Sequence, residues 1–99
     1  MEGVLNTFEF SEKNWDGKVN FIKVFDSTYS KTLWHIKAIR EIQTKNFYVK
    51  IGEVPDGFEQ VLPSDDTPFL PVQGKKYILL IDADFSPHVW TGEISWIAK

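Results

Sequence analysis

The chain has 99 residues, of which 42% are hydrophobic and 25% are charged, and its formal net charge is −3. This size fits one compact domain, because a second hydrophobic core would have too few residues to bury. We therefore expect residues 1–99 to form a single domain, in which residues 1–18 add an N-terminal strand and turn. The composition is that of a folded globular protein and indicates neither a disordered tail nor a membrane protein.

The charge is distributed unevenly along the chain. Residues 1–52 hold eight Lys and Arg against six acids, whereas residues 53–99 hold three against eight. A protein that binds nucleic acid usually presents a basic stripe with aromatic residues among it. Here the lysines are scattered singly apart from Lys75 and Lys76. The pattern therefore argues against a nucleic-acid partner.

The chain has no cysteine, which excludes disulfides, thiolate catalysis and cysteine-ligated metal sites. Its longest uninterrupted apolar run, Ile78–Ile81, is far shorter than the roughly 20 residues that span a bilayer. Met1–Phe10 has no basic stretch followed by an apolar core, so we see no signal peptide. We expect either a cytosolic protein or an exported one whose signal lies outside this sequence.

Strand signals dominate the chain. Short runs rich in aromatic and β-branched residues alternate with a period of two between clusters of Gly, Pro, Asp and Ser, as in half-buried strands. The predicted strands are Leu5–Phe10, Val19–Phe25, Thr32–Ile39, Asn46–Ile51, Phe58–Leu62, Lys76–Ala83 and His88–Ala98. Pro63–Pro71 holds three prolines, so any strand at Thr67–Leu70 must be short and lie at an edge. Seven or eight strands at this spacing predict an all-β fold, an antiparallel β-sandwich.

The alternation also predicts which side chains are buried in the first half of the chain. The strand Thr32–Ile39 places Trp34, Ile36 and Ala38 on one face, and we expect Trp34 to be the main core side chain. Phe47, Val49 and Ile51 likewise share a face of their strand. Phe8 and Phe10 share a face of the first strand, and Glu12–Lys18 is predicted as a turn.

Two connections have clear loop signals. Arg40–Lys45 is too short for a stable helix and has no apolar stripe, so it is predicted as a loop. In Glu53–Gly57, Pro55, Asp56 and Gly57 follow in the order that a turn requires, because proline fixes φ and glycine accepts positive φ.

The last two strands differ in character. Lys76–Ala83 carries the strongest strand signal, and its continuous apolar run is typical of a central strand. In His88–Ala98, large apolar side chains alternate with polar ones, and Gly92 is a predicted bulge.

The segment Leu70–Ile81 (LPVQGKKYILLI) resembles the tyrosine corner of fibronectin type III and immunoglobulin-like domains. In that motif a Leu and a Gly, here Gly74, precede a Tyr, here Tyr77, that opens the sixth strand. Such a tyrosine buries its ring while its hydroxyl bonds to the backbone a few residues upstream. Trp34 stands where these domains place an early core tryptophan. The resemblance covers about residues 19–97 and implies their antiparallel β-sandwich.

A narrower resemblance is to small uncharacterised bacterial envelope proteins, often lipoproteins, that contain one such domain. Their pattern is W-x-I, then Y-G-x-V-P-x-G-F-x-Q-x-x-P, then G-x-x-Y. The matching segments of this chain are Trp34–Ile36, Ile51–Pro63 and Gly74–Tyr77, with Ile51 in place of the first Tyr and no cysteine to carry a lipid. The resemblance implies the periplasm or cell envelope rather than the cytoplasm, and it implies no activity.

The sequence holds no recognisable catalytic motif. His35 and His88 are the only histidines, and neither has the spacing of a metal ligand pair. Nucleophilic catalysis would need a Ser or Thr that the fold brings beside one of them. We therefore predict that the protein is not an enzyme and has no cofactor. A small hydrolase is the least favoured alternative.

Two pairs of carboxylates are candidate calcium ligands, Asp65 with Asp66 and Asp82 with Asp84. Calcium needs six to eight oxygen ligands. Two aspartates at positions i and i+2 merely share a strand face, which a solvated sheet edge explains as well. We therefore predict no metal site and keep calcium as an alternative.

The function predicted from these features is a non-catalytic module that binds another protein. Loops held by a rigid β-fold, here Gly52–Gly57 and Asp65–Phe69, are where such domains place function, and a sheet face is the other option. By analogy, a small acidic domain can also serve as an inhibitor or immunity-type protein. Carbohydrate binding is the competing class, because exposed tryptophans often mark partner or sugar sites. The predicted binding residues are Glu53, Asp56, Phe58, Glu59, Trp15 and Trp90.

Overall fold

The structure, a computed structural model, describes residues 6–9, 17–43, 47–65, 67–85 and 88–99. In these residues the chain forms seven strands: β1 (Thr7–Glu9), β2 (Lys18–Asp26), β3 (Thr32–Ala38), β4 (Tyr48–Lys50), β5 (Phe58–Leu62), β6 (Lys76–Phe85) and β7 (His88–Ile97). The described residues form no helix. They therefore contain no helix that is long and apolar enough to cross a membrane. The predicted all-β fold is therefore confirmed.

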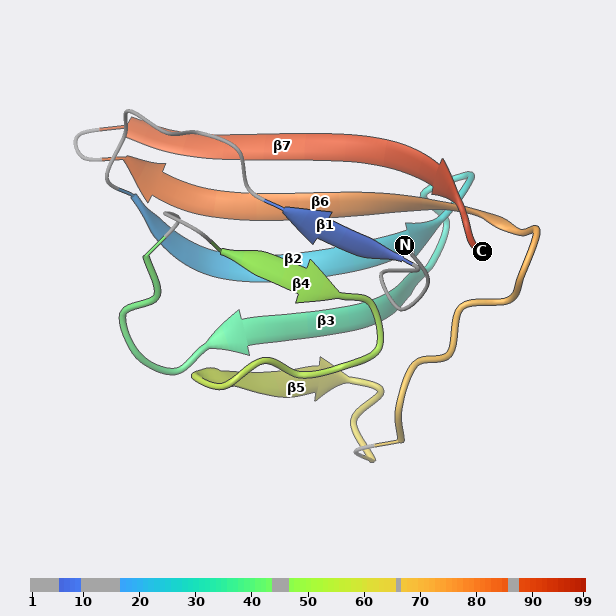
Figure 1. Cartoon of the computed structure of the whole chain (residues 1–99), viewed down its shortest axis with the longest axis horizontal. Helices are drawn as coiled ribbons and strands as arrows, with labels where there is room; N and C mark the ends of the chain where they lie inside the picture. The colour runs from blue at the N-terminus through green and yellow to red at the C-terminus, as the bar shows by residue number, and fades with distance from the viewer. Residues whose placement is uncertain (1–5, 10–16, 44–46, 66, 86–87) are drawn as a thin grey trace.

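The strands form two antiparallel sheets (Figure 1). The larger sheet has the strand order β5-β3-β2-β6-β7, and the smaller sheet pairs β1 with β4. β6 lies between β2 and β7, which agrees with the internal position that its apolar run predicts. The smaller sheet lies across one face of the larger one (Figure 1).

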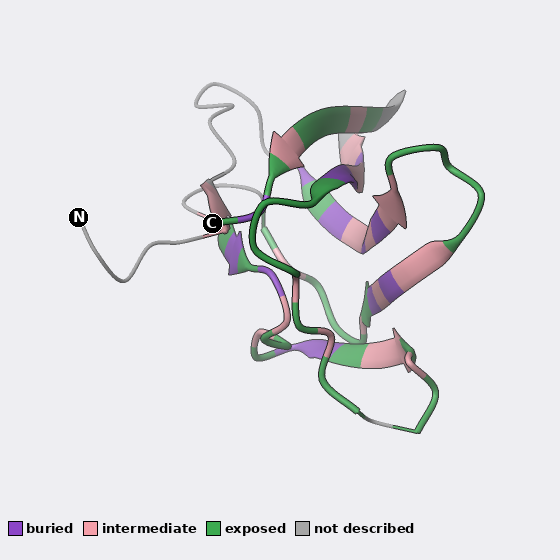
Figure 2. Cartoon of the chain, turned by 90° about the vertical axis from the view of Figure 1, so that its right-hand side faces the viewer, coloured by how far each residue is buried: buried purple, intermediate pink, exposed green. Residues whose placement is uncertain are grey.

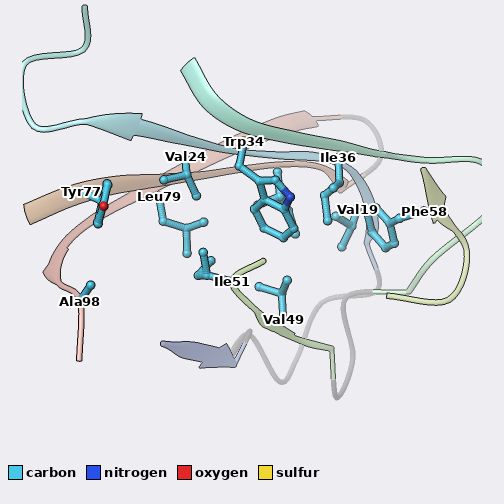
Figure 3. Packing of buried hydrophobic residues seen from close by; sticks show 11 residues of the cluster. Val19, Val24, Trp34, Ile36, Val49, Ile51, Phe58, Tyr77, Leu79 and Ala98 are labelled. Atoms are coloured by element: carbon cyan, nitrogen blue, oxygen red, sulfur yellow. The ribbon is translucent and has the colours of Figure 1, made fainter. Parts of the chain in front are cut away.

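The hydrophobic core lies between the two sheets (Figure 3). Trp34 and Ile36 of β3 are fully buried there, as their shared face predicts. Val49 of β4 and Ile51, directly after that strand, approach them from the side of the smaller sheet, which confirms the predicted inner face of that segment. Figure 2 shows the resulting alternation of buried with more exposed positions along the larger sheet.

The indole of Trp34 is anchored by Gln60 of β5. Its Nε1 donates a hydrogen bond to Gln60 Oε1 at 3.0 Å. The amide nitrogen of Gln60 in turn donates to the carbonyl oxygens of Pro63 at 3.0 Å and Thr67 at 2.9 Å. One side chain therefore satisfies the buried indole and fixes the connection that follows β5.

Thr67–Leu70, where the sequence allowed at most a short edge strand, forms no strand. Residues 67–70 have irregular backbone, because the carbonyl of Thr67 bonds to a side chain instead of a neighbouring strand. Phe69 packs against the core, with its ring centroid 6.5 Å from that of Trp34 and 5.7 Å from that of Tyr77. Tertiary packing has overridden the local strand preference of this segment.

The bulge predicted at Gly92 is wrong. β6 and β7 pair without a register shift from Lys76 opposite Ile97 to Phe85 opposite His88. The register shifts of the larger sheet lie in its other pairings. They fall between Val19 and Phe21 where β2 pairs with β6, between Val24 and Phe25 where β2 pairs with β3, and between His35 and Ile36 where β3 pairs with β5.

The hydrogen bond expected from the Tyr77 hydroxyl to the backbone upstream is present. Tyr77 is 1% exposed, and its hydroxyl accepts the backbone N–H of Val72 at 2.9 Å. The ring contacts Phe69 and Trp96. This tyrosine therefore ties the start of β6 to the turn that precedes it, as the motif predicts.

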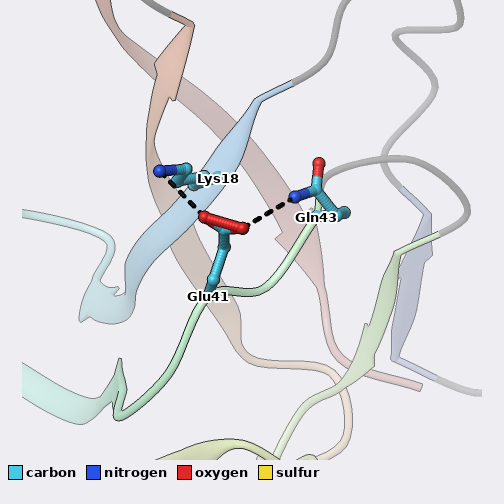
Figure 4. A network of polar contacts seen from close by, with 3 residues as sticks. All are labelled: Lys18, Glu41 and Gln43. Carbon is cyan, nitrogen blue, oxygen red and sulfur yellow. Dashed lines mark hydrogen bonds and ion pairs between the residues drawn. The ribbon is translucent and has the colours of Figure 1, made fainter.

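The segment after β3 runs as a loop, as predicted, over its described residues 39–43. The N–H of Val19 donates to the carbonyl of Ile42 at 2.8 Å, and Lys18 forms a bridge with Gln43. Glu41 lies between these groups, with its carboxylate 2.9 Å from Lys18 Nζ and 3.5 Å from Gln43 Nε2 (Figure 4). These contacts fasten residues 41–43, which lead from β3 toward β4, to the start of β2.

The two strands of the smaller sheet are shorter than predicted, with three residues each. Phe8 packs against the core and meets Trp96 edge to face, with ring centroids 5.0 Å apart. Leu5, Phe10 and residues 44–46 lie outside the described residues, as does the predicted turn up to residue 16.

The first prediction concerns the core. Trp34→Ala removes a fully buried indole and leaves Gln60 without its donor, so we expect a loss of about 3–5 kcal/mol in unfolding free energy. A loss of that size would unfold a marginally stable domain. Urea denaturation followed by circular dichroism measures it. The exposed Tyr48→Ala variant serves as the control, and equal effects in both variants would contradict the core assignment.

The second prediction concerns the Tyr77 hydroxyl. Tyr77→Phe keeps the ring packed but removes the acceptor of the Val72 N–H, so we expect a loss of about 1 kcal/mol. Tyr48→Phe, at a ring that is 64% exposed, should leave stability unchanged. The midpoints of urea unfolding report both changes. A Tyr77→Phe variant as stable as the parent would show that the hydrogen bond does not hold the corner.

Candidate functional site

The predicted loop between β4 and β5 consists of two hydrogen-bonded turns. The N–H of Glu53 donates to the carbonyl of Lys50 at 3.1 Å, and the N–H of Phe58 donates to the carbonyl of Pro55 at 3.2 Å. The N–H of Ile39, at the end of β3, donates to the carbonyl of Gly57 at 2.8 Å. The turn predicted at residues 53–57 is confirmed, and the loop is fastened to the larger sheet.

Two glycines allow this loop to lie close to its neighbours. Gly52 has a φ of +94°, and a Cβ at this position would collide with the carbonyl oxygen of Phe69. Gly57 has a φ of +89°, and its Cβ would lie 2.5 Å from Ile42 Cδ1. Both positions need glycine for conformation, and Gly52 needs it for space as well, because its close neighbour is a backbone carbonyl. The loop is thereby packed between the Phe69 segment and the 39–43 segment.

A shallow pocket of about 300 Å³ lies beside this loop. Its lining consists of Tyr48, Val49, Lys50, Glu53, Val54 and Pro55. Tyr48 is 64% exposed and Val54 is 42% exposed, so two large apolar side chains face solvent at its walls. Lys50 and Glu53 form an ion pair of 3.8 Å at its rim. The pocket combines apolar and polar surface in similar amounts, with an ion pair among its lining residues.

The three predicted acidic residues are each paired with a different basic side chain. Besides the pair at Glu53, Asp56 accepts a hydrogen bond from Arg40 at 2.7 Å, and Glu59 lies 3.2 Å from Lys37 across the β3 and β5 pairing. The Arg40 guanidinium holds the pKa of Asp56 below its ordinary value. The acids therefore do not form one negative surface, and only Glu53 lines the pocket.

Phe58, the apolar member of the predicted set, is a core residue. It is 6% exposed, and its ring stacks on Phe47 with centroids 5.7 Å apart. Its place at the start of β5 faces it inward, so its ring is not offered to a partner. Trp15 and the side chain of Trp90 lie outside the described part of the structure, and carbohydrate binding through them stays a prediction.

Tyr48 and Val54 are the residues that sequence reasoning missed. The alternation of the β4 segment turns Phe47 and Val49 inward, so the signal for an exposed Tyr48 was present. Val54 stands in a turn next to Pro55, where an apolar β-branched side chain has no structural purpose evident from sequence. Their meeting at one pocket depends on how the loop folds back along β4.

The second predicted loop is a local turn. Asp65 accepts hydrogen bonds from the backbone N–H of Thr67 at 3.2 Å and from its hydroxyl at 2.6 Å. These bonds hold the pKa of Asp65 below its ordinary value. Asp66 lies outside the described residues. The carboxylate of Asp65 is thus used by its own turn.

Asp82, one of the two candidate calcium ligands of β6, has protein partners as well. Asp82 accepts hydrogen bonds from Asn20 at 2.8 Å and from Thr91 at 3.3 Å, on the strands to either side. Within the described residues, no group of three His, Cys, Asp or Glu side chains is placed to hold a metal ion. Asp82 therefore joins three neighbouring strands through polar side chains.

His35 lies on the face of β3 that points away from Trp34. Its ring meets Phe21 edge to face, with centroids 5.6 Å apart. Burial lowers the pKa of this imidazole, and the positive charges of Lys23 and Lys37 lower it further. Among the described residues, no hydroxyl or carboxylate is hydrogen-bonded to it. This environment keeps the ring neutral and packs it on the outer face of the sheet.

Comparison of this chain with models of protein families, with curated proteins and with solved structures finds no significant match.

The third prediction is an acid sensitivity that depends on His35. The His35 imidazole binds a proton less readily in the folded state than in the unfolded state, where its pKa is 6.5. Stability from the neutral imidazole is therefore fully present above that pH and is lost as the pH falls through the lowered folded-state pKa. Melting temperatures of the parent and of His35→Gln, taken at about pH 8 and about pH 5, measure the effect. We expect the melting temperature of His35→Gln to fall less between these pH values than that of the parent. Equal falls would contradict the lowered pKa of His35 in the folded state.

Proposed function

We propose that this protein is a non-catalytic binding module that recognises another protein through the pocket beside the β4 to β5 loop. The observation that carries the proposal is the exposure of Tyr48 and Val54 on the walls of one pocket. Tyrosine is enriched at protein interfaces, because its ring supplies contact area and its hydroxyl supplies a hydrogen bond at little entropic cost.

The way the loop is held supports this function. Its two turns, its bond to Ile39 and the close approach at Gly52 leave it little freedom. A preformed loop loses less conformational entropy on binding than a flexible one. The ion pair of Lys50 and Glu53 at the rim offers charges of both signs to a partner, so we expect the partner surface to present an apolar side chain flanked by polar groups.

We also propose that the fold is a β-sandwich of the immunoglobulin or fibronectin type III kind. Two sheets with a shared core and the Tyr77 corner support it. Constant-type immunoglobulin domains divide their strands four to three, whereas the described strands here divide five to two. The proposed likeness therefore depends on the layers and the corner, and not on strand order.

The fourth prediction tests the pocket with a matched pair of variants. Val54→Asp places a charge on the pocket wall, whereas Val72→Asp makes the same change at an exposed site in the turn before β6. Each purified variant and the parent serve as bait for a bacterial envelope extract, and retained proteins are identified by mass spectrometry. The retained partner is then purified and titrated against all three by calorimetry.

We expect one partner to bind the parent and Val72→Asp alike and to lose at least about tenfold in affinity for Val54→Asp, or about 1.4 kcal/mol. Circular dichroism of both variants must match the parent. Equal binding to Val54→Asp would exclude the pocket as the interface. Failure of all three baits to retain a specific protein would contradict the function itself.

A further inference from the structure

The two edges of the larger sheet are different. β5 and β7 are its outer strands, and an outer strand presents unpaired backbone groups that can pair with another chain. Natural sheets protect such edges with short strands, bulges, proline, charged residues or a covering loop. The two edges of this sheet use these devices to very different degrees.

The β5 edge carries several of these protections. The strand has five residues and is followed by Pro63, and its pairing with β3 contains a register shift. The connection after it folds back, because the Gln60 side chain bonds to the carbonyls of Pro63 and Thr67. Glu59 adds a charge, paired with Lys37.

The β7 edge carries almost none. The strand has ten residues, HVWTGEISWI, with no lysine or proline and one carboxylate. Its register with β6 is continuous, and in the described part of the chain it pairs with no other strand. Ile94 and Ile97 are 50% and 58% exposed along it. Glu93, its one carboxylate, accepts a hydrogen bond from the Tyr29 hydroxyl.

We propose that β7 is a self-association edge, at which two copies of this chain pair β7 to β7 in antiparallel fashion about a two-fold axis at Ile94. The pairing would join two five-stranded sheets into one of ten strands. This surface is separate from the pocket of the proposed function, and the inference does not depend on that function.

The register follows from the direction of the backbone groups. Ala98 directs both its N–H and its carbonyl toward the β6 side, with bonds of 2.9 Å to Lys75 and 2.8 Å to Gly74. Since β7 has no register shift, every second residue, including Trp96 and Ile94, does the same. The residues between them direct their backbone groups outward. These residues are Thr91, Glu93, Ser95 and Ile97.

Only registers that join these outward groups to each other make hydrogen bonds between two copies. A two-fold axis at Glu93 would place two carboxylates opposite each other, which is unfavourable. An axis at Ile94 places Glu93 opposite the Ser95 of the second copy. It also sets Gly92, which has no side chain, opposite the large Trp96. At this register no two charges of one sign face each other, and the largest side chain of the strand faces its glycine, which suits a two-fold interface.

Exposure of Ile94 points to the same axis. Its partner in β6, Leu79, is 1% exposed and belongs to the core, so Ile94 lies on the inner face of the sheet yet remains half exposed. The smaller sheet therefore does not cover this position. In the proposed pair the two Ile94 side chains cover each other.

The fifth prediction uses cysteine in a chain that contains none. Opposed residues in a pair that is not hydrogen-bonded have Cα atoms about 4.5 Å apart, within the range of a disulfide. Ile94→Cys should therefore cross-link to a dimer under mild oxidation. Ile97→Cys is the matched control, because it faces Thr91 of the second copy and the two introduced thiols lie roughly 20 Å apart.

Sedimentation of the unmodified full chain gives the second measurement. We expect a concentration-dependent dimer that Ile94→Lys weakens by more than about tenfold, because two ammonium groups would then face each other at the axis. Ile39→Lys, the same change at a loop residue that is 60% exposed, should leave the dimer unchanged.

Three outcomes would overturn the proposal. These are a parent chain that stays monomeric at all concentrations, a dimer that survives Ile94→Lys, and cross-linking of Ile97→Cys as efficient as that of Ile94→Cys. Circular dichroism of every variant shows whether it is folded, so a folding defect is distinguished from a lost interface.

Discussion

The burial of Trp34 against Gln60 is the constraint on which much of the structure depends. The indole fills the space between the two sheets, and its N–H must find an acceptor there because an unpaired buried donor is costly. Gln60 supplies that acceptor and uses its own amide to hold the segment after β5. That segment brings Phe69 against Trp34, and the carbonyl of Phe69 lies against Gly52. A core contact is thus connected, residue by residue, to the loop that forms the candidate site.

This connection explains why the pocket is a surface with a defined shape. Val49 belongs both to the core and to the pocket lining, so the floor of the pocket is the outer side of the packed interior. Tyr48 and Lys50, its neighbours on β4, face outward because side chains alternate along a strand. The loop is held on one side by the Phe69 segment and on the other by Ile39. In the proposed function, residues on such a support need little reordering when a partner binds.

The pocket and the β7 edge lie on different parts of the fold and would engage partners in different ways. The pocket belongs to the smaller sheet and offers side chains, whereas the β7 edge belongs to the larger sheet and offers backbone groups. Backbone pairing depends little on side-chain identity, so an edge needs side chains that select its partner. On β7 these would be Glu93, Gly92 and Ile94, and together they favour one register of a second copy.

The sequence by itself determined the all-β class, the positions of most strands and the burial of Trp34, Ile36 and Tyr77, because period-two alternation and aromatic content are local properties. It also predicted the turn at residues 53–57 from Pro55 and Gly57. It could not show that Phe58 faces the core, that residues 67–70 are irregular, or that Glu53, Asp56 and Glu59 each pair with a separate base. Those features depend on which strands become neighbours, and the order β5-β3-β2-β6-β7 joins residues far apart in the chain. Only the tertiary structure could decide which residues share a pocket and which edge is left open, because neighbours across strands are set by long-range packing and not by local pattern.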